Sequence, residues 1–280
     1  MLLLLLVLPM AVRGAAVCPL AVPEYDCRLN GQMADAHDYT SRRSTLHRVV
    51  YDAFVKRSLL AGRRLVLWGD SPMHQQFVAI GCSLHRLDAA CVINATGTVR
   101  PCTGGEVVYW GPGDTPATRV DGVVRNLTLL DRSGGKEGGI WLDGSPMGPD
   151  DVVVYSTGSH LPLDHYRRGL ERLLLAFVDN VHAPYFLYLV TPQQHYATPT
   201  GEYDTGMARV PCARRRPRAR QDAEVALVYD TDPMAYLVDV NLTNAGHLHI
   251  GGVDCLRYCH PGVPDVIAGK LIEAVVEALE

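Results

Sequence analysis

The sequence predicts an α/β sandwich in which helices cover a mainly parallel sheet, and two observations lead to this fold class. First, three short segments are continuously apolar, as strands buried on both faces are. They cover residues 64–68, 151–155 and 185–190. Second, each of these segments is joined to a stretch whose apolar residues recur at helical spacing. Strands that alternate with helices along a chain are typical of parallel sheets.

The first strand is expected to sit between two helices. Apolar residues in 41–61 can share one helical face, so we expect a helix there. Strand 64–68 then runs directly into the Gly-Asp-Ser segment 69–71. Pro72 suits the first turn of a helix, because its missing N–H would have no intrahelical partner at that position. The second helix is therefore expected over 72–87.

The rest of the chain is less regular until its end. The stretch 92–150 is rich in Gly and turn residues, with brief apolar runs at 107–109 and 127–130. We expect loops and short strands there. A long loop is expected over 197–222. The remaining helices are expected over 163–182 and 264–280.

Length and composition favour one globular domain. The 280 residues are 48% hydrophobic and 20% charged, which is enough for a sizeable core. No clear linker divides the chain, so we expect a single domain over 17–280. The formal net charge of −4 does not steer the chain toward nucleic acid. Beyond the N-terminal run, no apolar stretch reaches roughly 18 residues, so no internal membrane span is expected.

The N-terminus and the cysteines point to the secretory pathway. An apolar run covers 2–12 and small residues follow it, which predicts a signal peptide over 1–16 or a short signal anchor. Membrane attachment is expected only if this segment is retained as an anchor. The eight cysteines suit disulfides in an oxidising lumen. No cysteine spacing matches a zinc site, so no metal is expected. N-glycosylation acceptor sequences begin at Asn94, Asn126 and Asn241.

Ser71 is the strongest candidate for chemistry. It follows a buried strand and opens a helix, which is where α/β folds bind ligands. The N–H groups of a helix N-terminus point at any anion that develops there. This is the environment that a nucleophilic serine needs. Asp-Ser is also a common helix cap, and the Gly-x-Ser-x-Gly elbow of α/β-hydrolases is absent.

Near the C-terminus, the segment 254–265 reads Asp-Cys-Leu-Arg-Tyr-Cys-His-Pro-Gly-Val-Pro-Asp. It resembles the Asp-Cys-x-His-Trp-Cys-x-Pro-Gly-Val-Pro-Asp block of the trichome-birefringence-like and PC-esterase group of SGNH/GDSL-type acyl esterases and O-acetyltransferases. The segment 69–71 resembles the nucleophile block of the same family. Shorter matches follow in the family's order and extend the resemblance over 27–280. They lie at 27–31, Gln76, Cys82, 191–195, Gly201, Gly206, Cys212 and 246–247.

The resemblance implies an SGNH-hydrolase-like three-layer sandwich stapled by disulfides. It pairs Cys212 with Cys255, and Cys259 with a cysteine upstream. It also implies that Ser71 attacks an acyl carbonyl and that Asp254 orients the histidine that takes the Ser proton. Transfer of the acyl group to a sugar hydroxyl would make the chain an O-acetyltransferase, and transfer to water an esterase. The sequence does not decide between the two.

The implied partner is a carbohydrate or polysaccharide, met in the Golgi lumen or after secretion. No cofactor is expected, apart from the acyl donor that a transferase needs. Arg257 stands where the family has its catalytic His, and a guanidinium cannot act as a base. His260 is the nearest replacement, and another histidine or no working base remain open. The alternative function is therefore a catalytically inactive family member that binds glycans or acts as a scaffold.

Five further residues are candidates for the oxyanion hole or for substrate contacts. In the family's oxyanion block, Ser156 replaces an Asn two residues before Gly158. A hydroxyl can donate to an oxyanion, although this stretch also suits a plain turn. His74 lies one helical turn after Ser71 and can border the site. The last two candidates, which equally suit structural hydrogen bonds, are His195 and His247.

Overall fold

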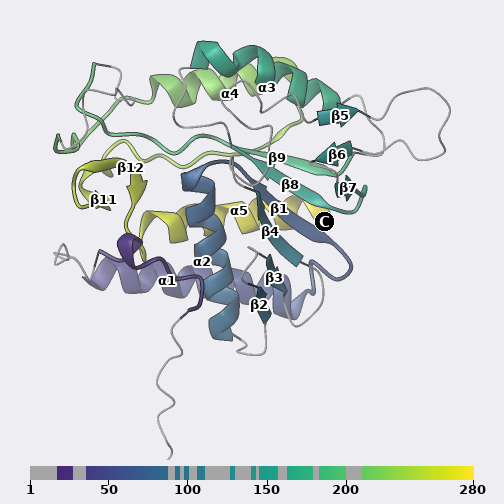
Figure 1. The fold of residues 1–280 in the computed structure, drawn as a ribbon, viewed down its shortest axis with the longest axis horizontal. Coiled ribbons are helices and arrows are strands. Elements are labelled where there is room, and N and C mark those ends of the chain that lie inside the picture. Colours follow the sequence, from purple (N-terminus) through teal and green to yellow (C-terminus); the bar gives the residue numbers. More distant parts are fainter. Residues whose placement is uncertain are drawn as a thin grey trace, which may run out of the picture.

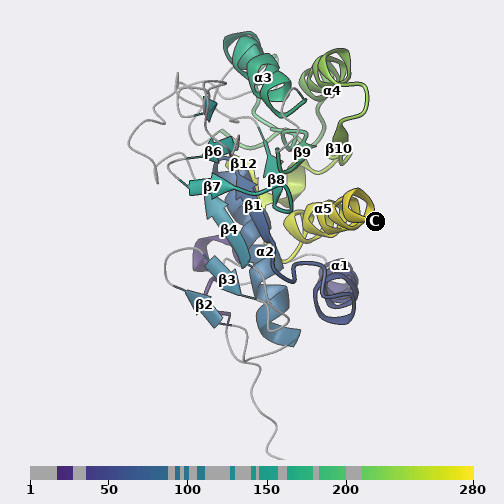
Figure 2. The same cartoon turned by 90° about the vertical axis from the view of Figure 1, so that its right-hand side faces the viewer.

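In the computed structural model of the chain, a seven-stranded sheet has helices on both faces (Figures 1 and 2). The structure describes residues 18–27, 36–87, 92–94, 98–100, 106–110, 127–129, 140–142, 145–156, 163–178, 183–199 and 210–280. The order across the sheet is β10-β9-β8-β1-β4-β3-β2. Its strands are β1 (Arg64–Trp68), β2 (Val92–Asn94), β3 (Thr98–Arg100), β4 (Glu106–Trp110), β8 (Val152–Tyr155), β9 (Tyr185–Leu189) and β10 (Tyr236–Val238).

The sheet is mainly parallel. Each strand from β10 to β4 in this order pairs with its neighbour in parallel, whereas β3 and β2 are added antiparallel at one edge. The predicted α/β class is therefore confirmed, and the three predicted strands are β1, β8 and β9. Two small sheets lie outside the main one. They are formed by β5 (Leu127–Leu129), β6 (Ile140–Leu142) and β7 (Ser145–Met147), and by β11 (His249–Ile250) and β12 (Asp254–Tyr258).

Side chains that alternate along the central strands divide the core in two. In β8, Val152 and Val154 face one layer, while Val153 and Tyr155 face the other. The first layer contains α1 (Ala36–Val50), α2 (Ser71–Leu87) and α5 (Val263–Leu279), and the second contains α3 (Leu163–Val178) and α4 (Ala219–Thr231). Figure 2 shows these two groups on opposite sides of the sheet. Burial on both faces explains why these strands are continuously apolar.

Several helix boundaries differ from the predicted ones. The helix expected over 41–61 is α1 followed by a π-helical turn, Tyr51–Lys56. The prediction of a long loop over 197–222 is wrong at its C-terminal end, because α4 begins at Ala219.

The inward face of α4 carries polar residues. Glu224 is fully buried and accepts hydrogen bonds from the Tyr188 hydroxyl at 3.1 Å and from the Thr191 N–H at 2.8 Å. This polar face interrupts the apolar period by which helices are recognised.

Three disulfides connect the described cysteines. Cys212–Cys255 confirms the pairing that the family resemblance implies. Cys27–Cys259 identifies the upstream partner of Cys259. Cys18–Cys82 ties the N-terminal segment to α2 and was not readable from the sequence. The other two cysteines, Cys91 and Cys102, lie outside the described residues.

Some predictions concern parts of the chain that the structure does not describe. These are the signal sequence over 1–16, Asn126 and Gly158, together with the side chains of Asn94 and His247. Asn241 is described and exposed, as a glycosylation acceptor must be. Within the described ranges, the helices are all too short or too polar to cross a bilayer.

Gly69 is required by a close approach between the end of β1 and the start of α2. A Cβ added there would lie 2.9 Å from the Met73 Cβ. We therefore expect Gly69→Ala to lower the free energy of unfolding by about 1–3 kcal/mol. Gly269→Ala is the matched control, because a Cβ at this helical glycine of α5 meets nothing within 4 Å. It should raise stability by about 0.4–1 kcal/mol. Urea unfolding measures both, and equal effects would contradict this account of Gly69.

Candidate active site

Ser71 begins α2 at the carboxyl end of β1, in the middle of the sheet. The ends of β1 and β8 are held together there, because the Ser156 N–H donates to the Trp68 carbonyl at 3.1 Å. The Tyr109 hydroxyl, from β4, donates to the carbonyls of Gly69 and Asp70 at 3.2 and 3.4 Å. The turn that presents Ser71 is thus anchored from both neighbouring strands. In parallel sheets this edge is where ligands bind.

Ser156 has the properties of an unused hydrogen-bond donor. Its side chain is 2% exposed, and its Oγ has no hydrogen-bond partner in the structure. Buried polar groups are normally paired, so an exception needs an explanation. One explanation is that this hydroxyl donates to an oxyanion that forms only during a reaction. The position of Ser156, at the end of the strand next to β1, fits that role.

Gln75 fixes β12 against α2. Its side-chain amide donates to the Tyr258 carbonyl at 2.7 Å and accepts from the Tyr258 N–H at 3.1 Å. We call this pair of hydrogen bonds the Gln75 clamp. Gln75 lies one helical turn after Ser71, so the two side chains share a face of α2. The clamp therefore holds β12 beside the helix that Ser71 opens, and Figure 1 shows the β11–β12 sheet next to α2.

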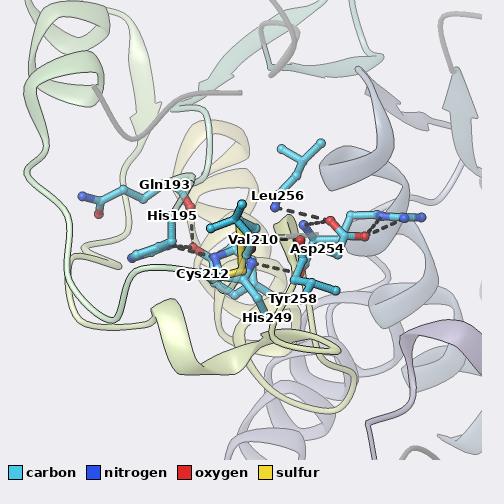
Figure 3. The surroundings of a disulfide bond; sticks show 11 residues. Gln193, His195, Val210, Cys212, His249, Asp254, Leu256 and Tyr258 are labelled. Atoms are coloured by element: carbon cyan, nitrogen blue, oxygen red, sulfur yellow. Dashed lines mark hydrogen bonds and ion pairs between the residues drawn. A yellow bond between two sulfur atoms is a disulfide. The ribbon is translucent and has the colours of Figure 1, made fainter. Parts of the chain in front are cut away.

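Two disulfides and a buried histidine pair also hold β12. Cys255 and Cys259 anchor the strand and the residue after it to Cys212 and Cys27. His249 Nδ1 lies 2.9 Å from the Arg257 carbonyl, which can only accept, so Nδ1 carries the proton. His249 Nε2 then accepts from His195 Nδ1 at 2.8 Å. Figure 3 shows His195 and His249 beside the Cys212–Cys255 bond.

His195 is fully buried, and its Nδ1 is engaged by His249. Burial lowers the pKa of its imidazole, and the carbonyls nearby offset only part of that effect. The neutral pair fixes the backbone at Arg257, and we assign His195 a structural role. His249 was missed by the sequence analysis, because an isolated histidine carries no pattern.

Asp254 is occupied by Arg257. Its carboxylate accepts from the Arg257 Nε at 2.6 Å and from the Arg257 backbone N–H at 3.1 Å, and the Nη2 of the same guanidinium lies at 2.6 Å. Burial disfavours the charge of Arg257, but Asp254 outweighs it and holds the pKa of the guanidinium above its usual value. The guanidinium carbon also lies 5.7 Å from the centre of the Tyr25 ring. A permanent cation therefore stands three residues after Asp254 and is paired with its carboxylate.

His260 lies on another side of Tyr25. Its ring stacks on Tyr25 with centroids 5.6 Å apart, and its backbone N–H donates to the Tyr25 carbonyl at 2.7 Å. No hydrogen bond joins His260 to Ser71 within the described part of the chain. Burial, and then the positive charge of Arg43, lower the pKa of His260 to about 3. Such a weak base is poorly matched to neutral pH, and its assignment as the catalytic base stays a prediction.

His74 is the imidazole that chain geometry keeps next to Ser71. The two residues are three apart on α2, and side chains at this spacing are neighbours. The His74 ring packs against Tyr109 and Tyr25, with centroids 4.8 and 6.2 Å away. Its side chain is half-buried, so it keeps access to solvent.

Asp265, which ends the Pro-Gly-Val-Pro-Asp motif, has a structural role. Its carboxylate accepts from the Gly262 N–H at 2.6 Å and so caps the first turn of α5. Burial raises the pKa of this carboxyl, although the Gly262 N–H acts in the opposite direction. Val263 and Pro264 fill the first helical positions, where a proline loses no hydrogen bond. The motif therefore fixes the start of the last helix.

The comparisons add no relative. No family model matches the chain, no curated protein matches it, and no solved structure matches it. Among the described residues, no group of three or more His, Cys, Asp or Glu side chains is arranged to hold a metal ion. The case for a function therefore depends on the motifs and on the geometry of this site.

Buried histidines should make the protein sensitive to acid. His260 has a pKa of about 3 when folded and about 6.5 when unfolded. As the pH falls below 6.5, the unfolded chain binds the proton first, so stability falls until the pH reaches the folded pKa. His47 acts in the same direction, since burial, Arg43 and Arg86 lower its pKa to about 4.

When the pH is lowered from 7 to 5, the free energy of unfolding of His260→Gln should fall by about 2 kcal/mol less than that of the wild type. Urea midpoints at the two pH values measure this, and equal losses in both proteins would contradict it.

Proposed function

We propose that this chain is a serine-dependent acyl-ester enzyme with an SGNH-like fold, an O-acetyltransferase or an esterase that acts on carbohydrate in the secretory pathway. The observation that carries the proposal is the Gln75 clamp. It ties the strand that bears Asp254 to the helix that Ser71 opens. Ser156, with its unused hydroxyl, stands at the end of the neighbouring strand. Ser71 and Ser156 both lie at the carboxyl edge of the parallel sheet, where ligands bind, and the Gln75 clamp fixes the strand that bears Asp254 against the Ser71 helix.

The proposed reaction begins when Ser71 Oγ attacks the acyl carbonyl and its proton passes to His74. The oxyanion accepts hydrogen bonds from N–H groups at the start of α2 and from Ser156. The bond to the leaving alcohol then breaks, and His74 returns the proton to the leaving oxygen. In the second half, a sugar hydroxyl or a water attacks the acyl-enzyme along the same proton path. We assign the base to His74 because it is the neighbour of Ser71 and keeps solvent access.

A second function is favoured by the ion pair between Asp254 and Arg257. A carboxylate that is committed to a guanidinium does not orient a histidine as it does in a serine triad. The surface around Arg257 would then bind a glycan without reacting, because the Arg257 side chain is 40% exposed. Arginine donates several hydrogen bonds in a fixed geometry, which suits hydroxyl-rich or anionic sugars.

Covalent labelling separates the two functions. A fluorophosphonate probe should label the wild-type protein, and Ser71→Ala should abolish labelling. Ser156→Ala should slow it about 10²- to 10³-fold, because an oxyanion donor is lost. His74→Gln should slow it by about 10² or more, whereas His260→Gln should leave it unchanged. Ser44→Ala, at an exposed serine of α1, is the control. Absence of labelling in folded wild-type protein would reject the enzyme.

If the probe does not label the wild-type protein, Arg257→His tests whether Arg257 is the reason. This variant restores an imidazole three residues after Asp254 and frees the carboxylate to orient it. A silent family member should gain labelling that still depends on Ser71. Arg257→Gln is the matched control, because it removes the cation without supplying a base. If neither variant reacts, then Arg257 is not what makes the site inert.

A further inference from the structure

A cavity of about 430 Å³ lies beside the candidate active site, and Tyr25, whose ring faces His74 and Arg257, forms part of its wall. It is bounded by the N-terminal segment 18–26, by α1, by the second half of α2 and by the loop before α5. Its first lining residue on α2, Val78, follows Ser71 by seven residues. At 1.5 Å per residue this is about 10 Å along the helix. The volume falls in the range of small-molecule sites.

The walls of the cavity are mostly apolar and covalently held. Leu46, Val78 and Ala79 are buried residues that line it. The disulfide Cys18–Cys82 closes the N-terminal segment over α2 at the cavity wall. The site is therefore a preformed apolar pocket, as small-molecule sites usually are.

Two polar atoms in this pocket are left without a partner. Ser83 is 2% exposed, and its Oγ is buried with no hydrogen bond in the structure. His260 Nε2 is likewise buried and unbonded. Both residues line the cavity, from α2 and from the loop before α5. Buried polar atoms are rarely unsatisfied, so a ligand that brings a polar group to either residue would supply a partner that the protein lacks.

The charged residues that line the pocket are two arginines and two acidic residues: Arg43, Arg86, Asp26 and Asp265. The Asp265 carboxylate accepts from the Gly262 N–H, and burial raises the pKa of this carboxyl although Arg43 and Arg86 act in the opposite direction. After burial, the positive charge of Arg43 is the largest influence that lowers the pKa values of His47 and His260. The field that disfavours protonation of both imidazoles attracts a negative group to the same space.

We propose that this cavity binds an aliphatic carboxylate of medium chain length. The chain lies against Leu46, Val78 and Ala79, and the carboxylate faces Arg43 and Arg86. The Ser83 hydroxyl donates to the carboxylate. This binding site uses no atom of Ser71, and the bound carboxylate supplies a partner for the Ser83 hydroxyl, which has none in the structure.

Calorimetric titration of the full chain with sodium octanoate tests the proposal. Octanoate should bind saturably at one site, and 1-octanol, its uncharged analogue, at least about ten-fold more weakly. Ser83→Leu fills the cavity and should abolish binding, while Arg43→Gln should weaken it about ten-fold. Arg167→Gln, at an exposed position of α3, should bind like the wild type.

Two further variants keep the test decisive. Ser83→Ala removes only an unbonded hydroxyl, so it should fold normally and bind octanoate several-fold more weakly. Ser71→Ala should bind octanoate as the wild type does, which separates this site from the serine. Any of three results would overturn the proposal: no saturable binding, equal affinity for octanoate and octanol, or loss of binding in Ser71→Ala.

Discussion

The two hydrogen bonds between the Gln75 amide and the peptide of Tyr258 join parts of the molecule that the main sheet does not connect. Strand β12 belongs to a separate two-stranded sheet, so no ladder of the central sheet positions Asp254. The side chain of Gln75 satisfies both backbone groups of one residue, as a neighbouring strand would. Because the amide is buried, either half of the clamp left unpaired would cost about 1–3 kcal/mol. The relation between the Ser71 helix and the Asp254 strand depends on it.

Around this clamp, covalent and polar constraints reinforce one another. The Cys212–Cys255 bond closes a sequence separation of 43 residues, which in the chain-entropy model stabilises the fold by about 4 kcal/mol. The Cys27–Cys259 bond lies two residues after Tyr25, whose ring faces Arg257 and stacks on His260. The His249 ring is within hydrogen-bond distance of the Arg257 carbonyl. A short strand with few ladder partners is thereby held by several separate contacts, which is what a precise site requires.

The sequence predicted those elements whose burial is visible in residue type. Strands β1, β8 and β9 are apolar on both faces, and α2 and α5 each carry a proline as their second residue, which suits a first turn. Helix α4 was hidden because its inward face binds polar groups. Gln221 donates to the Thr191 carbonyl, and Glu224 receives the Tyr188 hydroxyl. Periodicity detects apolar burial only, so a helix that packs through hydrogen bonds carries no such signal.

The sequence predicted the candidate site residues that belong to short motifs, but not the residues that contact them from elsewhere in the fold. Ser71, Ser156 and Asp254 could be named because each belongs to a local block, whereas Gln75, Tyr25 and His249 act across the fold and have no local signature. Arg257 is the instructive case. The family resemblance implies that Arg257 replaces a catalytic histidine. Only the structure shows that the Arg257 guanidinium is also paired with the Asp254 carboxylate. In the catalytic arrangement that the resemblance implies, a guanidinium at this position would therefore remove both the base and its carboxylate partner. In the function we propose, Ser71 draws its base from the helix it begins, where His74 stands one turn away.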